Sequence, residues 1–307
     1  MKILVTGGAG FIGSNFCDFL IGKKHSVVVI DDLSTGHLSN LECIIDSIEF
    51  FHEKLENFDF DAISNIDAIV HLAAQASVPI SIDRFKESSS ANILGTISVM
   101  EFCQQQEIPL VYASSSAIYG DLALGDDRDY RVDLLSPYAV DKYSMELYAK
   151  TSFKIHQLSS VGLRFFNVYG PRQDPTSPYS GVISIFSDRL LKGERIIING
   201  GHQTRDFVYV GDVVKAIYES VKVCLESVVC EQVNVLTGRS ISVDHLALLL
   251  GEEIKVVVDK IYKKLPDGDP EHSHGTTNKM VEILNMNLDD MVQIDMGLPR
   301  TVSFLRG

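Results

Sequence analysis

The chain has 307 residues, of which 45% are hydrophobic, and a formal net charge of −14. This length supports one large domain with a smaller appendage, and the excess of carboxylates disfavours general binding to nucleic acid or anionic lipid, both of which carry phosphate. No stretch approaches the roughly 18 apolar residues that cross a bilayer. The five cysteines are scattered without a C-x-x-C pair, so we expect a reduced, cytoplasmic protein with no membrane partner.

Short apolar runs alternate with helix-like stretches through the first half of the chain. The runs KILVTG, SVVVID, AIVHLA, PLVYAS and SVGLRFFN predict strands, and GSNFCDFLIGKK predicts a helix between the first two. Continuous apolar strands separated by helices are typical of a parallel sheet covered on both faces. The sequence therefore predicts an α/β fold with a Rossmann-type, doubly wound parallel sheet.

The second half departs from this pattern. After Asn167 the stretch VYGPRQDPTSPYSG gathers prolines, serines and glycines, which indicates a long functional loop. The segment QTRDFVYVGDVVKAIYESVKV then predicts a strand that returns to the main sheet and a helix that Asp212 caps. We expect the rest of the chain to form a smaller α/β part.

Three glycines join the first predicted strand to the first helix. Gly7, Gly10 and Gly13 have the spacing that lets backbone N–H groups approach a pyrophosphate, whose charge a helix N-terminus favours. The second strand ends in Asp31, about 20 residues further on, where a carboxylate accepts hydrogen bonds from ribose hydroxyls. Because Asp32 is adjacent and DDLSTG holds no arginine, a 2′-phosphate would be repelled. These features predict a dinucleotide site that prefers NAD to NADP.

The stretch SPYAVDKYSMELYAK predicts another helix, which begins with a Ser-Pro pair at 136–137. Tyr138 and Lys142 are four residues apart and so share one face of this helix. An ammonium group and a helix N-terminus beside a phenol both favour the phenolate, which would lower the pKa of Tyr138 toward the range of a general base. The alternative interpretation is that Tyr138 and Lys142 form an ordinary pair on the protein surface, without a catalytic role. Another face carries the residues that we expect to supply packing: Val140, Tyr143 and Leu147.

In combination, these motifs resemble the extended short-chain dehydrogenase/reductase family, in particular its nucleotide-sugar epimerases and dehydratases. The matching stretches run to about Asp212 and are TGGAGFIGS, VIDDLSTG, HLAAQASV, NILGT, SSSAIYG, YAVDK, RFFNVYGPR and TRDFVYVGDV. The resemblance implies a catalytic, bound NAD and a nucleoside-diphosphate sugar as substrate, most closely a UDP-sugar. It also implies an NAD-binding part formed by residues 1–166 and about 206–234, with a sugar-nucleotide part formed by 167–205 and 235–307.

The resemblance further assigns roles to individual residues. Tyr138 is the proton-transfer group, Lys142 binds the nicotinamide ribose, and Ser115 hydrogen-bonds the reacting sugar oxygen, with Ser116 as a near competitor. The implied cofactor-binding residues are Gly7, Gly10, Phe11, Ile12, Gly13, Asp31, Asp32, Ser34, Thr35, Gly36, Leu55, Leu72, Ala73, Ala74, Asn92, Ser114, Tyr138, Lys142 and Phe165. The implied substrate-binding residues are Gln75, Ser115, Ser116, Tyr138, Asn167, Ile197, Arg205 and Asp269.

Two residues of the matching stretches, Arg205 and His71, have an alternative role. Arg205 is expected to pair with the substrate diphosphate, since a guanidinium offers the two-pronged geometry that a phosphate fits, although a salt bridge to Asp206 would also explain it. His71 is expected to be a core or supporting histidine rather than a catalytic base.

The residue after the serines favours one reaction. Dehydratases and decarboxylases of the family carry an extra acid or base just after the catalytic hydroxyl, at the positions of Ser116 and Ala117 here. Because alanine moves no proton, we expect a 4-epimerase acting on UDP-glucose, on UDP-N-acetylglucosamine or on both. The alternatives are an epimerase of uronic acid nucleotides, another nucleotide-sugar reductase or dehydratase, and a non-catalytic NAD-binding regulator.

Two stretches depart from the family pattern. Lys54 stands where many relatives carry an aspartate that meets the adenine, which leaves Leu55 as the apolar neighbour. Pro266 occupies the usual arginine position of an R-x-G-D stretch, so Lys263 or Lys264 would replace its phosphate contact.

Two further expectations concern the substrate and the assembly. Ser273 falls near the position that limits bulk around the sugar C2 substituent, and its small size leaves room for an N-acetyl group. By analogy with the family we expect a homodimer, in which helices around 91–106 and 138–151 pair across a two-fold axis as a four-helix bundle.

Overall fold

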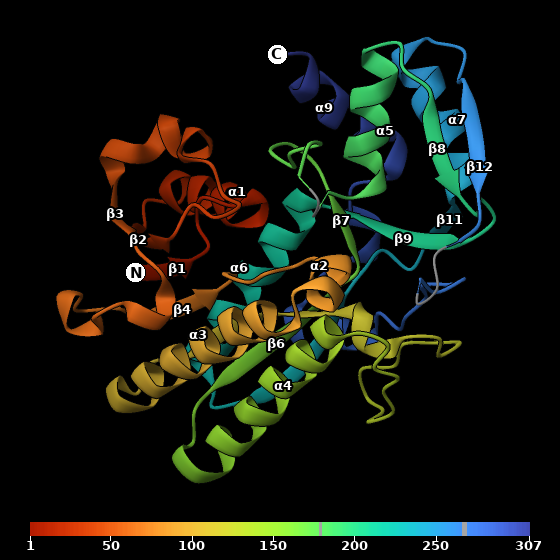
Figure 1. The fold of residues 1–307 in the computed structure, drawn as a ribbon. Helices are drawn as coiled ribbons and strands as arrows, with labels where there is room; N and C mark the ends of the chain where they lie inside the picture. Colours follow the sequence, from red (N-terminus) through yellow and green to blue (C-terminus); the bar gives the residue numbers. More distant parts are fainter. Residues whose placement is uncertain (178–179, 266–268) are drawn as a thin grey trace.

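The computed structural model describes residues 1–177, 180–265 and 269–307. Its largest unit is a seven-stranded sheet in the order β10-β6-β5-β4-β1-β2-β3, with helices on both faces (Figure 1). The strands are β1 (Lys2–Thr6), β2 (Ser26–Asp31), β3 (Ile48–His52), β4 (Ala68–His71), β5 (Leu110–Ser115), β6 (Ser160–Phe165) and β10 (Cys230–Val235). Every pairing between them is parallel, so their carboxyl ends lie at one edge. This confirms the doubly wound α/β fold.

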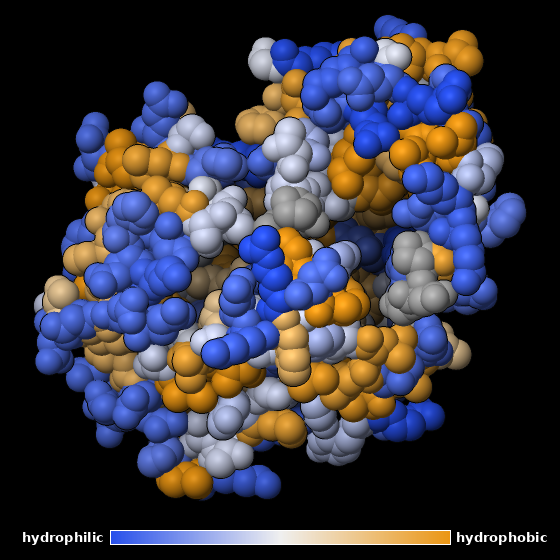
Figure 2. Space-filling model, viewed as in Figure 1, coloured by the Kyte–Doolittle hydropathy of each residue, from blue (hydrophilic) through white to orange (hydrophobic). Residues whose placement is uncertain are grey.

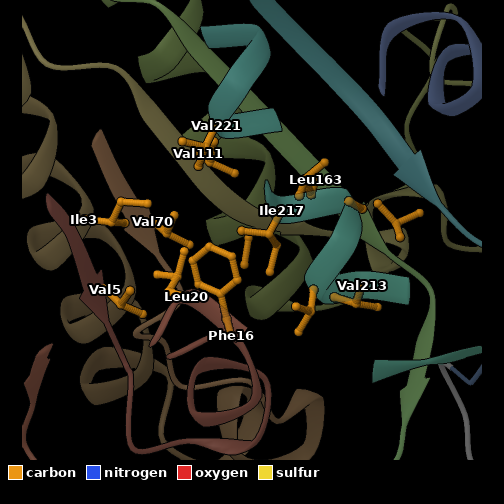
Figure 3. Close-up of a cluster of buried hydrophobic side chains, with 14 of the residues drawn as sticks. Ile3, Val5, Phe16, Leu20, Val70, Val111, Leu163, Val213, Ile217 and Val221 are labelled. Atoms are coloured by element: carbon orange, nitrogen blue, oxygen red, sulfur yellow. The ribbon is translucent and has the colours of Figure 1, made fainter. Parts of the chain in front are cut away.

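Helices pack on the two faces because alternate strand residues point in opposite directions. Ile3 and Val5 of β1 belong to a core with α1 (Phe11–Gly22), α6 (Val210–Glu226) and α8 (Asn278–Leu284), whereas Leu4 packs with α3 (Phe85–Gln106) and α4 (Pro137–His156). Figure 3 shows the first core, where Phe16 and Leu20 of α1 meet Ile217 of α6 against the strands. The short α2 (Val78–Asp83) precedes α3.

A smaller unit stands beside the main sheet and has a core of its own. Its strands form two sheets, one of β7 (Asn167–Tyr169), β9 (Thr204–Tyr209) and β11 (Ser240–Ser242), the other of β8 (Ile196–Asn199) and β12 (Lys260–Lys263). Its helices are α5 (Val182–Leu191), α7 (Val243–Ile254) and α9 (Ile294–Arg306). Segments of 3-10 helix complete the described chain at η1 (Leu38–Ser47), η2 (Leu55–Asn57), η3 (Phe60–Ala62), η4 (Ser116–Tyr119) and η5 (Leu288–Asp290).

The structure corrects three details of the sequence reading. β9 pairs with β7 and β11, so the return to the main sheet is made by α6 and β10 rather than by this strand. Asp212 lies inside the first turn of α6, whose N-cap is Tyr209, and its carboxylate accepts a hydrogen bond from the Val292 N–H at 2.8 Å. Val140 and Leu147 are exposed rather than packed, with 44% and 47% of their surface accessible.

Across the described ranges, no helix is long and apolar enough to span a membrane. The division of the chain into an NAD-binding part and a sugar-nucleotide part stays a prediction.

Candidate active site

Adjoining cavities open at the carboxyl edge of the main sheet, where the strand order reverses between β1 and β4. Two of them, of about 320 and 310 Å³, share the glycine turn and the residues after β4. A third, of about 740 Å³, lies between the main sheet and the smaller unit and shares Ser115, Tyr138 and Phe165 with the first. Figure 2 shows a hollow on this face between the two units. Ligands of doubly wound sheets bind at such a switch point.

The turn after β1 requires glycine at two positions. Gly7 has φ +71°, and a Cβ there would lie 2.6 Å from the Ala73 nitrogen. A Cβ on Gly13 would lie 2.1 Å from the Gly7 carbonyl oxygen, so only glycine lets α1 pack this closely on the turn. The N-cap of α1 is Gly10, which offers no side-chain hydrogen bond, and the first N–H groups of the helix therefore face the cavity as an anion site.

Asp31 closes the other end of the cofactor cavities. Its carboxylate accepts hydrogen bonds from the Ala9 N–H at 2.8 Å and the Leu33 N–H at 2.9 Å. Burial raises the pKa of Asp31, while these two bonds lower it. Each oxygen keeps a further lone pair, which is what two ribose hydroxyls need.

Nearly all the implied cofactor residues line the two smaller cavities; the exception is Asn92. Asn92 is buried behind them, where its side chain accepts from the Gln75 N–H at 2.8 Å and donates to Asp141 at 3.0 Å. Gln75 was expected at the substrate but lines the cofactor cavity instead, and its buried Nε2 has no hydrogen-bond partner in the described chain. Lys54 and Leu55 both line this cavity. The glycine cradle, the Asp31 carboxylate and an unused amide donor fit a dinucleotide.

The three catalytic candidates meet where the cavity of about 740 Å³, the candidate substrate cavity, joins the cofactor cavity of about 320 Å³. Ser115 ends β5, and its hydroxyl accepts from the Ala117 N–H at 3.1 Å; the same side chain acts on Tyr138 and lowers the pKa of its phenol. Tyr138 stands in the first turn of α4, which Ser136 caps by accepting from the Ala139 N–H at 3.2 Å. Lys142 is buried one turn later on the same helix.

The electrostatics differ from the sequence-based expectation. Burial raises the pKa of Tyr138 above its ordinary value, and the Ser115 hydrogen bond opposes this only in part. Lys142 donates to the Ala113 carbonyl at 2.8 Å, with its Nζ 5.8 Å from the centre of the Tyr138 ring. Burial lowers the pKa of Lys142 to about 8. In the protein without cofactor, burial thus outweighs the groups that would lower the pKa of Tyr138, and a lowering by Lys142 stays a prediction.

A model of the NAD dependent epimerase/dehydratase family matches residues 3–235. The chain belongs to this family. The UDP-glucose 4-epimerase of Mycolicibacterium smegmatis is 33% identical over 315 residues, which cover 100% of this chain and 99% of the relative.

Two solved structures are similar over the whole chain. The UDP-N-acetylglucosamine 4-epimerase from Methanobrevibacter ruminantium, in complex with UDP-N-acetylmuramic acid, has a TM-score of 0.93 at 33% identity and covers 99% of this chain and 98% of that one. The UDP-glucose 4-epimerase of Thermotoga maritima, with UDP-glucose, has a TM-score of 0.92 at 35% identity and covers 100% and 99%. The protein is thus an isomerase of this family, and its cofactor is NAD.

The cavity of about 740 Å³ holds most of the implied substrate residues. Ser115, Ser116, Tyr138, Asn167, Arg205 and Asp269 line it, whereas Ile197 on β8 is absent from its described lining. Arg205 pairs with Asp269 at 2.5 Å, so the alternative partner Asp206 is excluded; that carboxylate accepts from the Thr237 and Arg239 N–H groups. Asn167 donates to the Asp206 carbonyl at 3.1 Å. Ser273 lines the same cavity, while Pro266 lies outside the described residues.

His71 is a supporting residue in this site. Its ring is buried between the Thr6 hydroxyl at 2.7 Å and the Thr96 hydroxyl at 3.0 Å. Burial lowers the pKa of His71 to about 3, which keeps the ring neutral. His71 is not among the described residues that line the substrate cavity, in agreement with a core role.

A buried ion pair that the sequence did not reveal lies next to β5, the strand that ends in Ser115. Arg164 of β6 binds both oxygens of Glu146 on α4, at 2.8 and 2.7 Å. Glu146 also accepts from the Ser114 hydroxyl at 2.6 Å, and Arg164 donates to the Tyr119 hydroxyl at 2.7 Å. Tyr119 in turn lines the substrate cavity and donates to Asn234 at 2.7 Å. The network joins β5, α4, β6 and β10 directly behind Ser115, and no sequence spacing links these four elements.

The loop after β7 also supplies cavity residues that received no role from the sequence. Arg172 lines a cofactor cavity, and Gln173 lines both that cavity and the substrate cavity. The signal available in the sequence was the run of prolines and polar residues in this loop. It predicted a functional segment without saying which ligand the segment meets.

Proposed function

We propose that this enzyme interconverts UDP-hexoses by epimerisation at C4, with UDP-glucose, UDP-N-acetylglucosamine or both as substrates. The observation that carries the proposal is the junction of the two cavities, where the Ser115 and Tyr138 hydroxyls stand together beside Lys142. A transfer of hydride and proton at one carbon needs these groups and a hydride acceptor next to the sugar.

The expected roles follow from the chemistry of each group. Bound NAD supplies the hydride acceptor and, in its oxidised form, a positive charge. Tyr138 accepts the proton of the 4-hydroxyl, for which its pKa must fall from the raised value of the protein alone; a nearby cation favours the phenolate. Ser115 hydrogen-bonds the same sugar oxygen and holds it against Tyr138. Lys142 orients the ribose and adds to the positive potential.

The lining after Ser115 supports epimerisation over elimination. Ala117 follows Ser116 in η4 and offers only a methyl group. The carboxylates in the described lining are Asp83 at the end of α2 and Asp269, which is paired with Arg205. Neither stands on the strand end that carries Ser115. With about 740 Å³, the cavity offers room for a 4-keto sugar to turn over between hydride removal and return.

Two features support the choice of a UDP-sugar. Arg205 and Asn167 line the cavity on the side of the smaller unit, where a diphosphate would meet a guanidinium and an amide. The relatives described above include enzymes named for UDP-glucose and for UDP-N-acetylglucosamine. Ser273 is small enough to admit an N-acetyl group.

The test is proton NMR of the purified enzyme with a panel of UDP-sugars and no added NAD. We expect the C4 epimer of at least one UDP-hexose to appear while the NAD stays bound. If UDP-glucuronate were the sugar nucleotide that turned over and no UDP-hexose did, the substrate would be a UDP-uronic acid and not a UDP-hexose. Accumulation of free NADH in proportion to added substrate would contradict epimerisation and indicate a reductase-type cycle. Absence of any turnover, with NAD bound, would favour a regulatory protein.

A further inference from the structure

The loop that follows β7 is attached to the NAD-binding side of the molecule by three contacts. Asn15 of α1 donates to the Pro171 carbonyl at 3.1 Å, Arg172 donates through Nη2 to Asp18 of α1 at 2.5 Å, and His37 contacts Asp174 at 3.2 Å. Figure 1 shows this green loop between α1 and α5. Arg172, Gln173 and Asp174 of this segment line the same cavity as the glycine turn and the start of α1.

Arg172 has two unusual properties in this loop. Its φ of +71° lies in the left-handed region, which costs a side-chain-bearing residue energy that glycine avoids. Its Nη1 is buried and has no hydrogen-bond partner in the described chain, although Nη2 is held by Asp18. A strained backbone and an unused buried donor both cost stability, and such costs concentrate where a ligand repays them.

The charges around this cavity indicate which ligand that is. In the described lining of this cavity, the lysine and arginine side chains are Lys142 and Arg172. Lys142 donates a hydrogen bond to the Ala113 carbonyl, at the end of the cavity that holds Tyr138. Arg172 shares the lining with Gly10, Phe11 and Gly13, which form the glycine turn and the start of α1. A guanidinium beside a helix N-terminus is suited to a pyrophosphate, because each contributes donors and positive potential to the same anion.

We propose that Arg172 donates through Nη1 to the pyrophosphate of NAD, and that Asp18 and Asp174 hold the segment Pro171–Asp174 closed over the cofactor. This segment then slows NAD release, which a cycle without net redox change requires. The inference depends on NAD being the cofactor and not on which sugar is the substrate.

The test measures NAD retention without any sugar. Purified holoenzyme is dialysed, and the NAD remaining per protomer is determined over time by acid extraction and enzymatic cycling. We expect Arg172→Met to release NAD roughly 10- to 100-fold faster than the wild type, the range for losing one hydrogen bond to a charged group. Arg172→Lys should release NAD at an intermediate rate, because a lysine keeps the positive charge but lacks the planar guanidinium with its several N–H donors.

Two control variants make the result specific. Asp18→Asn removes the charge on α1 but keeps both the guanidinium and an amide oxygen that can accept its hydrogen bond, so it should accelerate NAD release less than Arg172→Met does. Arg195→Met removes a surface arginine paired with Asp259 and should match the wild type. Unchanged release in Arg172→Met, or equal acceleration in Arg172→Met and Asp18→Asn, would overturn the proposal and leave Arg172 as a strut between α1 and the loop. Failure of every UDP-sugar in the NMR assay would leave this result untouched.

Discussion

Ser115 and Tyr138 come from different elements and meet because β5 ends where α4 begins to cross the sheet edge. The Ser115 hydroxyl is held by the backbone of η4, and the backbone of Tyr138 is held in the first turn of α4, so both positions are ordered before substrate binds. Such preorganisation is what makes a proton-transfer pair effective.

Replacing Tyr138 by phenylalanine tests this pair. The variant keeps the ring and loses the hydroxyl, so we expect kcat for C4 epimerisation to fall by about 10²- to 10⁴-fold while NAD stays bound. Steady-state kinetics and the NAD content of the purified variant check this. A Tyr138→Phe enzyme with wild-type kcat would remove the tyrosine from the proposed chemistry.

The lowered pKa of Lys142 leads us to expect that the stability of the protein depends on pH. In the folded, NAD-free protein the pKa of Lys142 is about 8, against an ordinary value of 10.5. Between these values the unfolded chain holds a proton that the folded chain has lost, so stability rises with pH through this window. The gain is at most about 1.4 kcal/mol per pH unit for one group.

Urea unfolding of NAD-free protein from pH 7.5 to 10.5 measures this effect, with Lys142→Met as the reference that lacks the group. We expect the wild type to gain stability relative to the variant as the pH rises. A constant difference across the series would mean that Lys142 stays charged when buried.

At the scale of elements, the start of α4 links stability to catalysis. Ser136 caps this helix two residues before Tyr138, whereas Ser242 caps α7 in the smaller unit by accepting from the His245 N–H at 3.1 Å. The two caps are chemically alike, and only one is next to the reacting groups.

We therefore expect Ser136→Ala and Ser242→Ala to lose about 1 kcal/mol of unfolding free energy each, which is the usual cost of an N-cap. Only Ser136→Ala should also lower kcat, because fraying of the first turn of α4 moves Tyr138. Urea unfolding and steady-state kinetics on both variants check this. An equal kcat for the two would show that the cap does not position the tyrosine.

At the scale of the whole molecule, the outer faces of α3 and α4 remain unexplained by the monomer. Leu94, Val140, Leu147 and Ile155 expose 50%, 44%, 47% and 68% of their surface there. α3 and α4 pack side by side, so these residues support the proposed dimer, in which two such pairs form a four-helix bundle.

Light scattering during size exclusion tests the assembly. We expect the wild type to have twice the chain mass of 34.0 kDa, and Leu147→Glu to approach that of one chain because a carboxylate would be buried at the bundle. The matched control is Leu248→Glu on α7, a leucine of similar exposure that should leave the dimer intact. A monomeric wild type would exclude the bundle in solution.

Local patterns were sufficient to predict much of this enzyme. The Gly7 turn, the Asp31 strand end and the Tyr138–Lys142 spacing are short-range features, each tied to one element by backbone geometry, and the structure brings them to the expected edge of the sheet. The order of apolar runs and helices predicted the doubly wound fold for the same reason.

Contacts between distant segments were decided only by the tertiary structure. The sequence placed the 204–209 strand in the main sheet and Gln75 at the substrate, since nothing local distinguishes one sheet edge or cavity from another. The Glu146–Arg164 pair and the contact of Arg172 with Asp18 join residues of separate elements, and no periodicity records them. Even the pKa of Tyr138 is decided by burial and by the neighbouring Ser115, which are properties of the folded neighbourhood and not of a spacing along a helix.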